Sequence, residues 1–458
     1  MHTKFRIEQD SLGEVKVPAG AYYGAQTQRA VENFPVSGIR FPRRFIQALG
    51  LIKQAAAQVN HDLGLLEDST ARAIQKAAQQ VIDGDRDDQF VLDIFQTGSG
   101  TSTNMNANEV IANLAAMELG AEPGEKKVHP NDHVNMSQSS NDVIPSAMHI
   151  AARRGLEEDL IPALERLQAG LQEKAKEFDD VLKSGRTHLM DATPIRLGQE
   201  FGGYARQMEQ NTARLRKVSG ELAELALGGT ATGTGINCPT EFPGQVIEVI
   251  SQKTGLNFFE AKNHFEAQSS KDAIVFTAGA LNTLASALMK FANDIRWLSS
   301  GPTSGLGEIS LPAVQPGSSI MPGKVNPVMA ESIMQVSARV MGHMHTVTIC
   351  NQQGNFQLNV MMPVMAQAVL ESISILANVV EAFRTKCLTG IQANRDRCRE
   401  LLELNPSIAT ALNQAIGYDK ASEVAKKAAA EHKPVPQVVR ELGLLSEEEL
   451  KSALDVRS

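Results

Sequence analysis

Long apolar stripes at helical spacing constrain this chain more than any other feature of its sequence. One stripe recurs every seventh residue at Met208, Leu215 and Leu222, which is typical of helices that pack along their length. A second, residues 362–380, contains a single charge, Glu371. Helices with such broad apolar faces need partner helices, and a bundle shared between subunits would bury them best. The stripes therefore predict a mainly α protein built around a long-helix bundle.

The longest uncharged run, residues 273–289, has the composition of a membrane span. It contains Thr277, Asn282, Thr283 and Ser286 and falls short of the roughly 20 residues that span a bilayer. A helix that is apolar on every face is otherwise one that is buried on every face. We therefore expect a core helix and no membrane partner.

The charge balance excludes several classes of partner. The 44 basic and 52 acidic residues give a formal net charge of -8, so nothing suggests a general attraction for nucleic acid or anionic membranes. An anionic substrate must then meet a local positive site. The first ten residues have no apolar core, so we expect no secretory signal and a cytoplasmic protein.

The cysteines and histidines give no sign of a disulfide or metal site. None of the four cysteines lies in a CxxC pair, and a large chain does not need covalent cross-links, so we expect reduced thiols. His343 and His345 are two residues apart, the wrong spacing for one helix face. They predict a surface pair and no metal.

The length of 458 residues predicts two or three domains. Changes in the helical pattern place boundaries near residues 138 and 395. We expect a mostly helical N-terminal domain at 1–138, a central long-helix bundle at 139–394 and a small helical C-terminal domain at 395–458.

Two local signals predict further elements within these domains. Strand signals are few, and residues 13–24 are expected to form a short hairpin. Ser446 with Glu449 predicts a capping box that opens the last helix.

Four polar segments interrupt the helical pattern, and three of them immediately precede helical runs. The segments are residues 96–108, 129–142, 185–193 and 316–327. Three helices are expected to follow these segments. Thr101 and Thr103 stand before the first, and Ser139, Ser140 and Asn141 stand before the second. Asn326 is the expected N-cap of the third, with Pro327 at its first helical position. Helix starts bind carboxylates through free backbone N–H groups and partial positive charge. Capping alone explains any one start, but several of them with a nearby lysine favour a dianion site.

The segment at 316–327 predicts a mobile loop. Gly317 and Gly323 bracket two serines, and Lys324 adds a cation at its base, so the loop could close on substrate. A nucleotide P-loop is excluded because five residues separate the glycines and Val325 follows Lys324. The glycine-rich run 228–235 also misses dinucleotide spacing, which leaves it a structural role.

These segments resemble the fumarase/aspartase superfamily. GSSIMPGKVNP, residues 317–327, is similar to its signature, which some aspartases share. QTGSGT, HPND, SSND, GRTHLMDAT, LALGGTATGTG and GNFQLNV resemble class II fumarases more closely. Aspartases tend to have Ser where Asp132 stands, and STND in place of SSND. The resemblance runs from about Arg6 to near the C-terminus, with minor departures at Ser102 and Thr103.

The resemblance implies reversible anti addition of water to fumarate, a tricarboxylic acid cycle reaction that gives (S)-malate through an aci-carboxylate carbanion. Ser318 matches the family's catalytic base on the mobile loop. His188 matches the second catalytic residue, which acts through water, and Glu331 matches the carboxylate that pairs with that histidine. Lys324 and Asn326 match the groups that hold the growing negative charge.

The remaining matches concern binding. The substrate-binding positions that the resemblance implies are Ser99, Gly100, Thr101, Ser139, Ser140, Asn141, Thr187, Ser319, Lys324, Val325 and Asn326. His129, Pro130, Asn131 and Asp132 match a secondary anion site near the entrance, for which ordinary turn-forming polarity is the plainer interpretation. No cofactor and no metal are implied.

The resemblance also implies a homotetramer in which central helices form one bundle and each active site draws segments from three subunits. A monomer would then be inactive. An aspartate ammonia-lyase would use the same fold and loop on an amine leaving group, since fold alone does not fix function. A non-catalytic helical assembly protein would keep only the scaffold, but the joint presence of Ser318, His188, Lys324, Asn326 and Glu331 argues against it.

Overall fold

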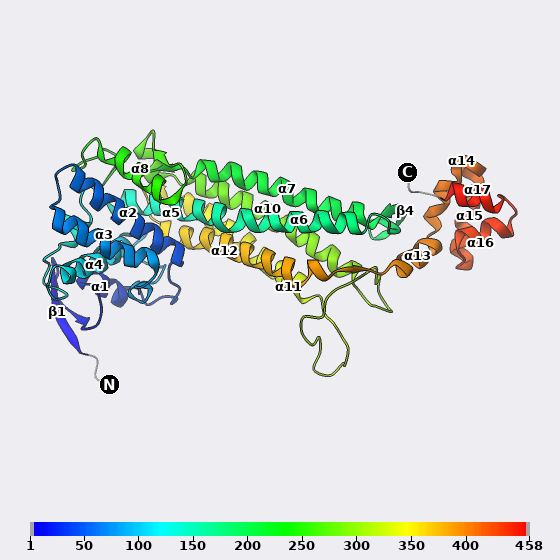
Figure 1. Cartoon of the computed structure of the whole chain (residues 1–458), viewed down its shortest axis with the longest axis horizontal. Helices are drawn as coiled ribbons and strands as arrows, with labels where there is room; N and C mark the ends of the chain where they lie inside the picture. Colours follow the sequence, from blue (N-terminus) through cyan, green and yellow to red (C-terminus); the bar gives the residue numbers. More distant parts are fainter. Residues whose placement is uncertain (1–3, 455–458) are drawn as a thin grey trace. The chain divides into compact units, whose positions relative to one another are not determined.

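The computed structural model describes residues 4–454, and this part of the chain is mainly α, as predicted (Figure 1). It contains seventeen α-helices, several of them longer than twenty residues. The helices are α1 (Ala25–Asn33), α2 (Arg43–Asp62), α3 (Asp68–Asp83), α4 (Thr101–Glu118), α5 (Ser140–Gly155), α6 (Ile161–Glu177), α7 (Leu197–Glu221), α8 (Phe242–Thr254), α9 (His264–Ser269), α10 (Asp272–Leu298), α11 (Val328–Asn351), α12 (Met362–Lys386), α13 (Arg395–Leu404), α14 (Asn413–Ile416), α15 (Tyr418–Glu431), α16 (Val435–Glu441) and α17 (Glu447–Ala453). Short helical turns are η1 (Asp87–Gln89), η2 (Pro130–Val134), η3 (Leu156–Leu160), η4 (Leu388–Gly390) and η5 (Pro406–Leu412).

The strands of the described chain form only two-stranded sheets. The pairs are β1 (Phe5–Asp10) with β2 (Gly13–Pro18), β3 (Leu182–Thr187) with β4 (Met190–Arg196), β5 (Glu224–Leu225) with β6 (Phe259–Glu260), β7 (Ile309–Ser310) with β10 (Gln392–Ala393), and β8 (Gly354–Asn355) with β9 (Leu358–Asn359). All are antiparallel except β5 with β6. The predicted hairpin within residues 13–24 is wrong, because β2 pairs with the preceding segment β1. The polar sequence of β1 gave no strand signal. Arg6 of β1 anchors the hairpin to the following segment by donating to the carbonyls of Ala21 and Tyr23.

The helices are grouped into two compact units. The first comprises the described chain up to Pro162 with Ala213–Ala285 and Val336–Ala377, and the second comprises Ala163–Thr212, Ser286–Gln335 and the described chain from Asn378. The boundaries near residues 138 and 395 stay predictions; each lies beside a helix start, that of α5 or α13.

An edge-to-face ladder of aromatic rings packs the helices of the second unit against one another. Phe178, which directly follows α6, contacts Phe201 of α7 with ring centroids 5.2 Å apart. The ladder continues through Tyr204 to Phe291 of α10 and Phe383 of α12, at 5.2 Å for each of the last two contacts. Each edge-to-face pair contributes about 1 kcal/mol beyond its buried area. The ladder therefore fixes how these helices align.

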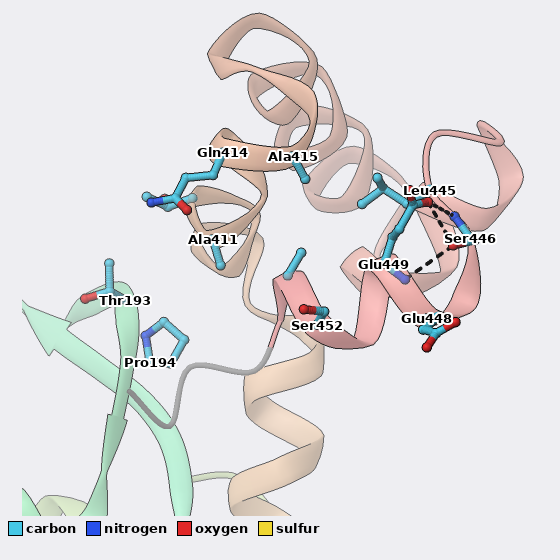
Figure 2. Close-up of a pocket in the computed structure, with 12 residues that line it drawn as sticks. Thr193, Pro194, Ala411, Gln414, Ala415, Leu445, Ser446, Glu448, Glu449 and Ser452 are labelled. Atoms are coloured by element: carbon cyan, nitrogen blue, oxygen red, sulfur yellow. Dashed lines mark hydrogen bonds between the residues drawn. The ribbon is translucent and has the colours of Figure 1, made fainter.

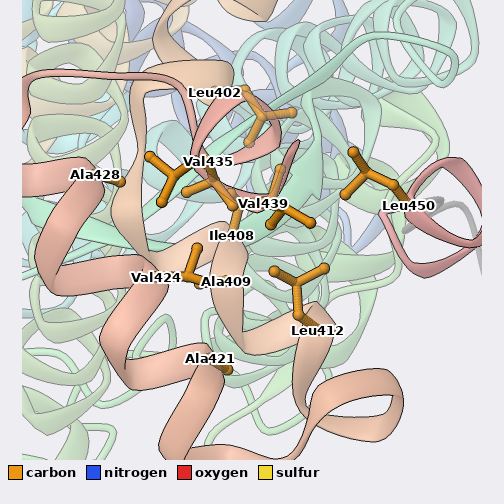
Figure 3. Packing of buried hydrophobic residues seen from close by; sticks show 11 residues of the cluster. Leu402, Ile408, Ala409, Leu412, Ala421, Val424, Ala428, Val435, Val439 and Leu450 are labelled. Carbon is orange, nitrogen blue, oxygen red and sulfur yellow. The ribbon is translucent and has the colours of Figure 1, made fainter. Parts of the chain in front are cut away.

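The C-terminal helices of the second unit have a core of their own (Figure 3). Its buried side chains come from α13, η5, α15, α16 and α17 and are Leu402, Ile408, Ala409, Leu412, Ala421, Val424, Ala428, Val435, Val438, Val439 and Leu450. The predicted capping box is confirmed: Ser446 Oγ accepts from the Glu449 N–H, and the Glu449 carboxylate accepts from the Ser446 N–H.

Two helices of the described chain, α10 and α12, are long and apolar enough to span a membrane by length and composition. Within their most apolar windows, 72% of α12 residues but only 44% of α10 residues are buried. The expectation that α10 is buried on every face is therefore wrong for a single chain. Phe276 and Trp297 remain 47% and 52% exposed, because neighbouring helices of the same chain cover only part of α10.

Candidate active site

Hydroxyl and amide side chains from two helix starts lie together in the first unit. Ser99 Oγ lies 2.7 Å from Thr101 Oγ1, which in turn lies 2.8 Å from Ser140 Oγ. Ser139 is the N-cap of α5 and precedes the helix as expected, whereas Ser140 and Asn141 lie in its first turn, contrary to the expectation; Ser139 Oγ accepts from the Asn141 N–H at 3.2 Å. Five of the predicted substrate-binding side chains thus form one cluster, which we call the hydroxyl cluster: Ser99, Thr101, Ser139, Ser140 and Asn141.

The start of α4 differs from the sequence-based expectation. The helix begins at Thr101, so the expectation that Thr101 and Thr103 precede it is wrong. Gly100 is the cap residue and has φ of 74°, in the left-handed region that favours glycine. A Cβ at Gly100 would also lie 2.9 Å from Ile144 Cγ2. Glycine is therefore required here on two grounds, and it lets the backbone turn sharply into the helix.

Gly98, two residues earlier, approaches the segment after β9 so closely that no side chain fits. A Cβ at Gly98 would lie 1.7 Å from the carbonyl oxygen of Val360, and the Gly98 carbonyl accepts from the Met362 N–H at 3.1 Å. Gly98→Ala is expected to lower the free energy of unfolding by about 2–3 kcal/mol, the upper part of the range for overpacking, because backbone must move. Denaturant titration measures this. In the control Gly244→Ala, where no atom lies within 4 Å of the added Cβ, stability should not fall, and equal losses would contradict the close approach.

The glycine-rich run at 228–235 lies against the start of α5. Asp142 Oδ2 accepts from the N–H groups of Gly228 and Thr230 at 3.1 and 2.9 Å. Asn141 Nδ2 donates to the Ala231 carbonyl at 2.8 Å. The run thus orients the amide of Asn141, which fits the structural role expected for it.

The residues of the predicted secondary anion site form the start of η2: His129 is its N-cap, and Pro130, Asn131 and Asp132 lie within it. His129 Nδ1 accepts from the N–H groups of Asn131 and Asp132 at 3.3 and 3.1 Å, and it lies 3.2 Å from Asp132 Oδ2. His129, Pro130 and Asn131 also line a cavity of about 410 Å³, together with Lys126 and several acidic residues. The turn satisfies its own polar groups, so its role in anion binding stays a prediction.

In the second unit, the β3–β4 hairpin presents His188 at a strained turn. His188 and Leu189 have φ of 55° and 59°, in the left-handed region that residues other than glycine seldom adopt and that costs them energy. Thr187, His188 and Leu189 are all exposed. Among the described residues, His188 has no hydrogen-bonding or ion-pair partner. A strained, exposed and unpartnered histidine is available to a substrate or to another subunit.

A buried ion cluster holds this hairpin, and sequence analysis missed it. The Glu308 carboxylate, which is 0% exposed, accepts from Arg186 Nη1 and Nη2 at 2.9 and 2.8 Å. Lys183 Nζ lies 3.2 Å from Glu308 and 3.1 Å from Glu200. Glu308 directly precedes β7, at the root of the predicted mobile loop. The only sequence signal was a lone acidic residue in an otherwise uncharged stretch.

The predicted mobile loop is closed at its base. The Gly317 N–H donates to the Lys324 carbonyl at 3.0 Å, and Asn326 Nδ2 donates to the Gly317 carbonyl at 2.6 Å. The prediction of Asn326 as N-cap with Pro327 as first helical residue is wrong by one position, because α11 begins at Val328. The Asn326 side chain is engaged with the loop instead of the helix start.

Ser318 lies within this loop with its oxygen held by backbone donors. Ser318 Oγ accepts from the N–H groups of Ile320 and Met321 at 3.2 and 3.1 Å. Loop residues 313–318 and 321–325 line an open cavity of about 430 Å³. Two donors aimed at one hydroxyl oxygen would stabilise negative charge on it. Ser319 and Val325 are exposed beside it.

The single chain does not pair all of the predicted residues. Glu331 lies in the first turn of α11, and within the described residues no hydrogen bond or ion pair joins it to His188. The hydroxyl cluster belongs to the first unit, whereas Thr187, His188 and the Ser318 loop belong to the second.

Comparison with known proteins identifies the family. A family model described as lyase matches residues 13–342, and one described as fumarase C C-terminus matches residues 408–458. A fumarate hydratase class II from Halobacterium salinarum is 57% identical over 99% of this chain and 97% of the relative. The chain belongs to the class II fumarate hydratase family.

Other class II fumarate hydratase relatives and solved structures agree. The fumarate hydratase class II of Thermus thermophilus is 52% identical over 97% of this chain and 96% of the relative. The crystal structure of class II fumarase from Schistosoma mansoni matches with a TM-score of 0.94 and 38% identity, covering 99% of both chains. A Brucella melitensis fumarate lyase:delta crystallin bound to cobalt matches with a TM-score of 0.95 and 46% identity, covering 99% of this chain and 98% of the other.

A cavity of about 1090 Å³ between β4 and the C-terminal helices is not the site expected of a class II fumarate hydratase (Figure 2). Of the described residues, those that line it include Glu448 and Glu449 but no Lys, Arg or His, and none of the predicted site residues. Two carboxylates without a cation would repel a dianion.

The thiols and the predicted histidine pair lie outside the candidate site. All four cysteines are free, as predicted, and burial raises the pKa of the Cys387 and Cys398 thiols to about 12, so both are inert. The prediction of a surface histidine pair is wrong for His343, which is buried with Nδ1 3.0 Å from Ser372 Oγ. His345 is exposed, and the described residues contain no cluster suited to a metal.

Proposed function

We propose that this chain catalyses the reversible hydration of fumarate to (S)-malate. The observation that carries the proposal is the 57% identity, over 99% of the chain, to a protein named fumarate hydratase class II. The geometry agrees with it, because hydroxyl groups at two helix starts and a serine held by backbone donors suit carboxylate binding and proton abstraction.

Ser318 is the proposed base. In the dehydration direction, its alkoxide takes a proton from the carbon next to one carboxylate of malate. The electron pair passes into that carboxylate and gives an aci-carboxylate, whose charge Lys324 and Asn326 hold. The N–H groups of Ile320 and Met321, which donate to Ser318 Oγ, support the alkoxide. The hydroxyl group on the neighbouring carbon then leaves as water, with its proton supplied through a water on His188.

The other carboxylate is proposed to bind at the hydroxyl cluster. Thr101 and Ser140 hydroxyls lie 2.8 Å apart at the starts of α4 and α5, where helix dipoles and free N–H groups favour an anion. Asn141, whose amide is oriented by the Ala231 carbonyl, adds a further polar contact.

We propose a homotetramer with active sites shared between subunits, and the exposed faces of the single chain support association with other copies. α10 leaves Phe276 and Trp297 about half exposed (47% and 52%), and an apolar face of this kind is expected to be covered by another copy. Within residues 4–454 of one chain, the side chains of His188 and Glu331 have no hydrogen-bonding or ion-pair partner, so we infer that the histidine of one subunit meets the carboxylate of another. Sedimentation is expected to give a species four chains in mass.

A substrate panel tests the proposed activity. With purified protein, the ultraviolet absorbance of fumarate should rise with (S)-malate and stay flat with aspartate, with (R)-malate and with argininosuccinate. Hydration of fumarate in deuterated water should place one deuterium anti to the hydroxyl group. Fumarate formed from aspartate alone would mean an ammonia-lyase, and no product from any compound would mean a scaffold protein.

A further inference from the structure

Lys53 of α2 is a fully buried lysine that forms no ion pair with any residue that the structure describes. Its side chain lies in the first unit with 0% exposure. Nζ donates to Asn135 Oδ1 at 3.0 Å and to Gln138 Oε1 at 2.9 Å. Both partners are neutral amides. A buried cation without a salt bridge is costly, so its presence requires a compensating role.

The hydrogen-bonding partners of Lys53 connect it to the starts of both helices that contribute to the hydroxyl cluster, α4 and α5. Asn135 Oδ1 also accepts from Asn104 Nδ2 and Asn108 Nδ2 of α4, each at 3.2 Å. Asn104 lies three residues after Thr101, and Gln138 directly precedes Ser139. Lys53 is thus the central donor of a buried amide network behind the hydroxyl cluster.

Asp142 is the charged group that acts on Lys53, and no charged side chain of α3, α4, α8 or η2 does so. Asp142 is itself fully buried, and its carboxylate accepts from the N–H groups of Ser139, Gly228 and Thr230. These three backbone donors already stabilise much of the negative charge of the Asp142 carboxylate. Burial lowers the pKa of Lys53 to about 7, although Asp142 acts to raise it. The lysine is therefore poised between its charged and neutral forms near neutral pH.

We propose that Lys53 takes up a proton when a dicarboxylate binds at the hydroxyl cluster, and so supplies positive charge behind the two helix starts. This inference rests on the proposed function, which places a dianion there. A nearby dianion favours the charged form of lysine. Lys53 does not touch the ligand, so it is a positioning residue that affects ligand affinity and KM more than kcat.

The sign of the pH dependence follows from linkage. Because the ligand raises the pKa of Lys53, the added affinity is fully present below the pKa of the free protein, about 7. It is lost as the pH rises through the higher pKa of the complex. Loss of this charge, by pH or by substitution, is expected to weaken binding by about tenfold, which corresponds to a pKa rise of about one unit.

Calorimetric titration with succinate, a four-carbon dicarboxylate that carries no hydroxyl group to lose, tests the proposal. Titrations at pH 7.5 in buffers of different ionisation enthalpy give the number of protons taken up. Wild type is expected to take up a fraction of a proton, and Lys53→Met is expected to take up less and to bind about threefold more weakly at this pH, which lies between the two pKa values of Lys53; the full loss of about tenfold is expected below pH 7. The matched control is Lys271→Met, because Lys271 is also buried with its pKa lowered by burial to about 7, but among the described residues its Nζ donates to the Ala267 and Ser270 carbonyls alone. It should behave like wild type.

The possible outcomes separate the role of Lys53 from the proposed function. Equal proton uptake by wild type and Lys53→Met, or equal affinities, would overturn the inference and leave the proposed function intact if malate is still dehydrated. Absence of both succinate binding and turnover in wild type would defeat the proposed function as well. If Lys53→Met does not fold, Lys53→Arg replaces it: a permanently charged side chain should bind succinate without that share of uptake, and unchanged uptake would again contradict the role of Lys53.

Discussion

Replacing Ser318 with alanine is expected to lower kcat for dehydration of (S)-malate by about a thousandfold, within the range for loss of a group that transfers a proton. The backbone N–H groups of Ile320 and Met321 would keep their positions but lose the oxygen that they stabilise. His188→Asn is expected to cause a loss of similar size, since asparagine tolerates the left-handed backbone at φ of 55° but cannot carry the proton. KM should change little in both variants.

Matched controls separate chemistry from general damage. Ser304→Ala changes an exposed serine of the same unit, and His345→Asn changes the exposed histidine of α11. Neither belongs to the proposed site, and both should keep full turnover. If Ser318→Ala and His188→Asn also turn over malate at the wild-type rate, the residue assignment is wrong.

Glu308→Gln is expected to cost about 3 kcal/mol of unfolding free energy, since it leaves buried cations without their partner. Arg186 would lose a bidentate contact at 2.9 and 2.8 Å, and Lys183, which is 1% exposed, would retain only Glu200. Arg186 stands two residues before His188, so the hairpin should also loosen and kcat should fall. Denaturant titration and malate turnover measure the two effects.

The control for Glu308 is an ion pair at the surface. Arg395 and Asp180 lie 2.7 Å apart with both side chains well exposed, and exposed pairs contribute little to stability. Asp180→Asn should therefore leave the unfolding midpoint unchanged. A Glu308→Gln protein that is as stable as Asp180→Asn would show that the cluster does not hold the hairpin.

The mainly α architecture could be predicted because the apolar periodicity of each helix is a property of its own local sequence. Residues 362–380 carry nearly continuous apolar character, and α12 is largely buried as expected. The same reasoning failed for α10, since composition shows that a face is apolar but not whether the same chain or another covers it. The start of α11 was predicted within one residue, but α4 and α5 begin several residues earlier than expected. Thr101 and Thr103 lie inside α4 and not before it, because a left-handed backbone turn at Gly100, which propensity does not reveal, sets where that helix begins.

Local motifs and the family resemblance predicted the residues of the hydroxyl cluster and of the Ser318 loop. They did not predict the buried residues that hold these segments in place. Glu308 meets Arg186 across 122 positions of sequence, and Lys53 meets Asn135 across 82. Such partners are created by tertiary packing alone. The prediction that Glu331 pairs with His188 came from family resemblance and not from a local pattern.

Mixing two inactive variants tests most directly whether active sites are assembled from different chains. Ser318→Ala and His188→Asn proteins are denatured together, refolded and assayed with (S)-malate, beside each variant refolded alone. If the serine and the histidine of one site come from different subunits, random hybrid tetramers should regain about a quarter of wild-type activity, because each residue is intact with even odds. If activity in the mixture stays at the level of the separate variants while hybrid tetramers form, the proposed sharing of the site between subunits is contradicted.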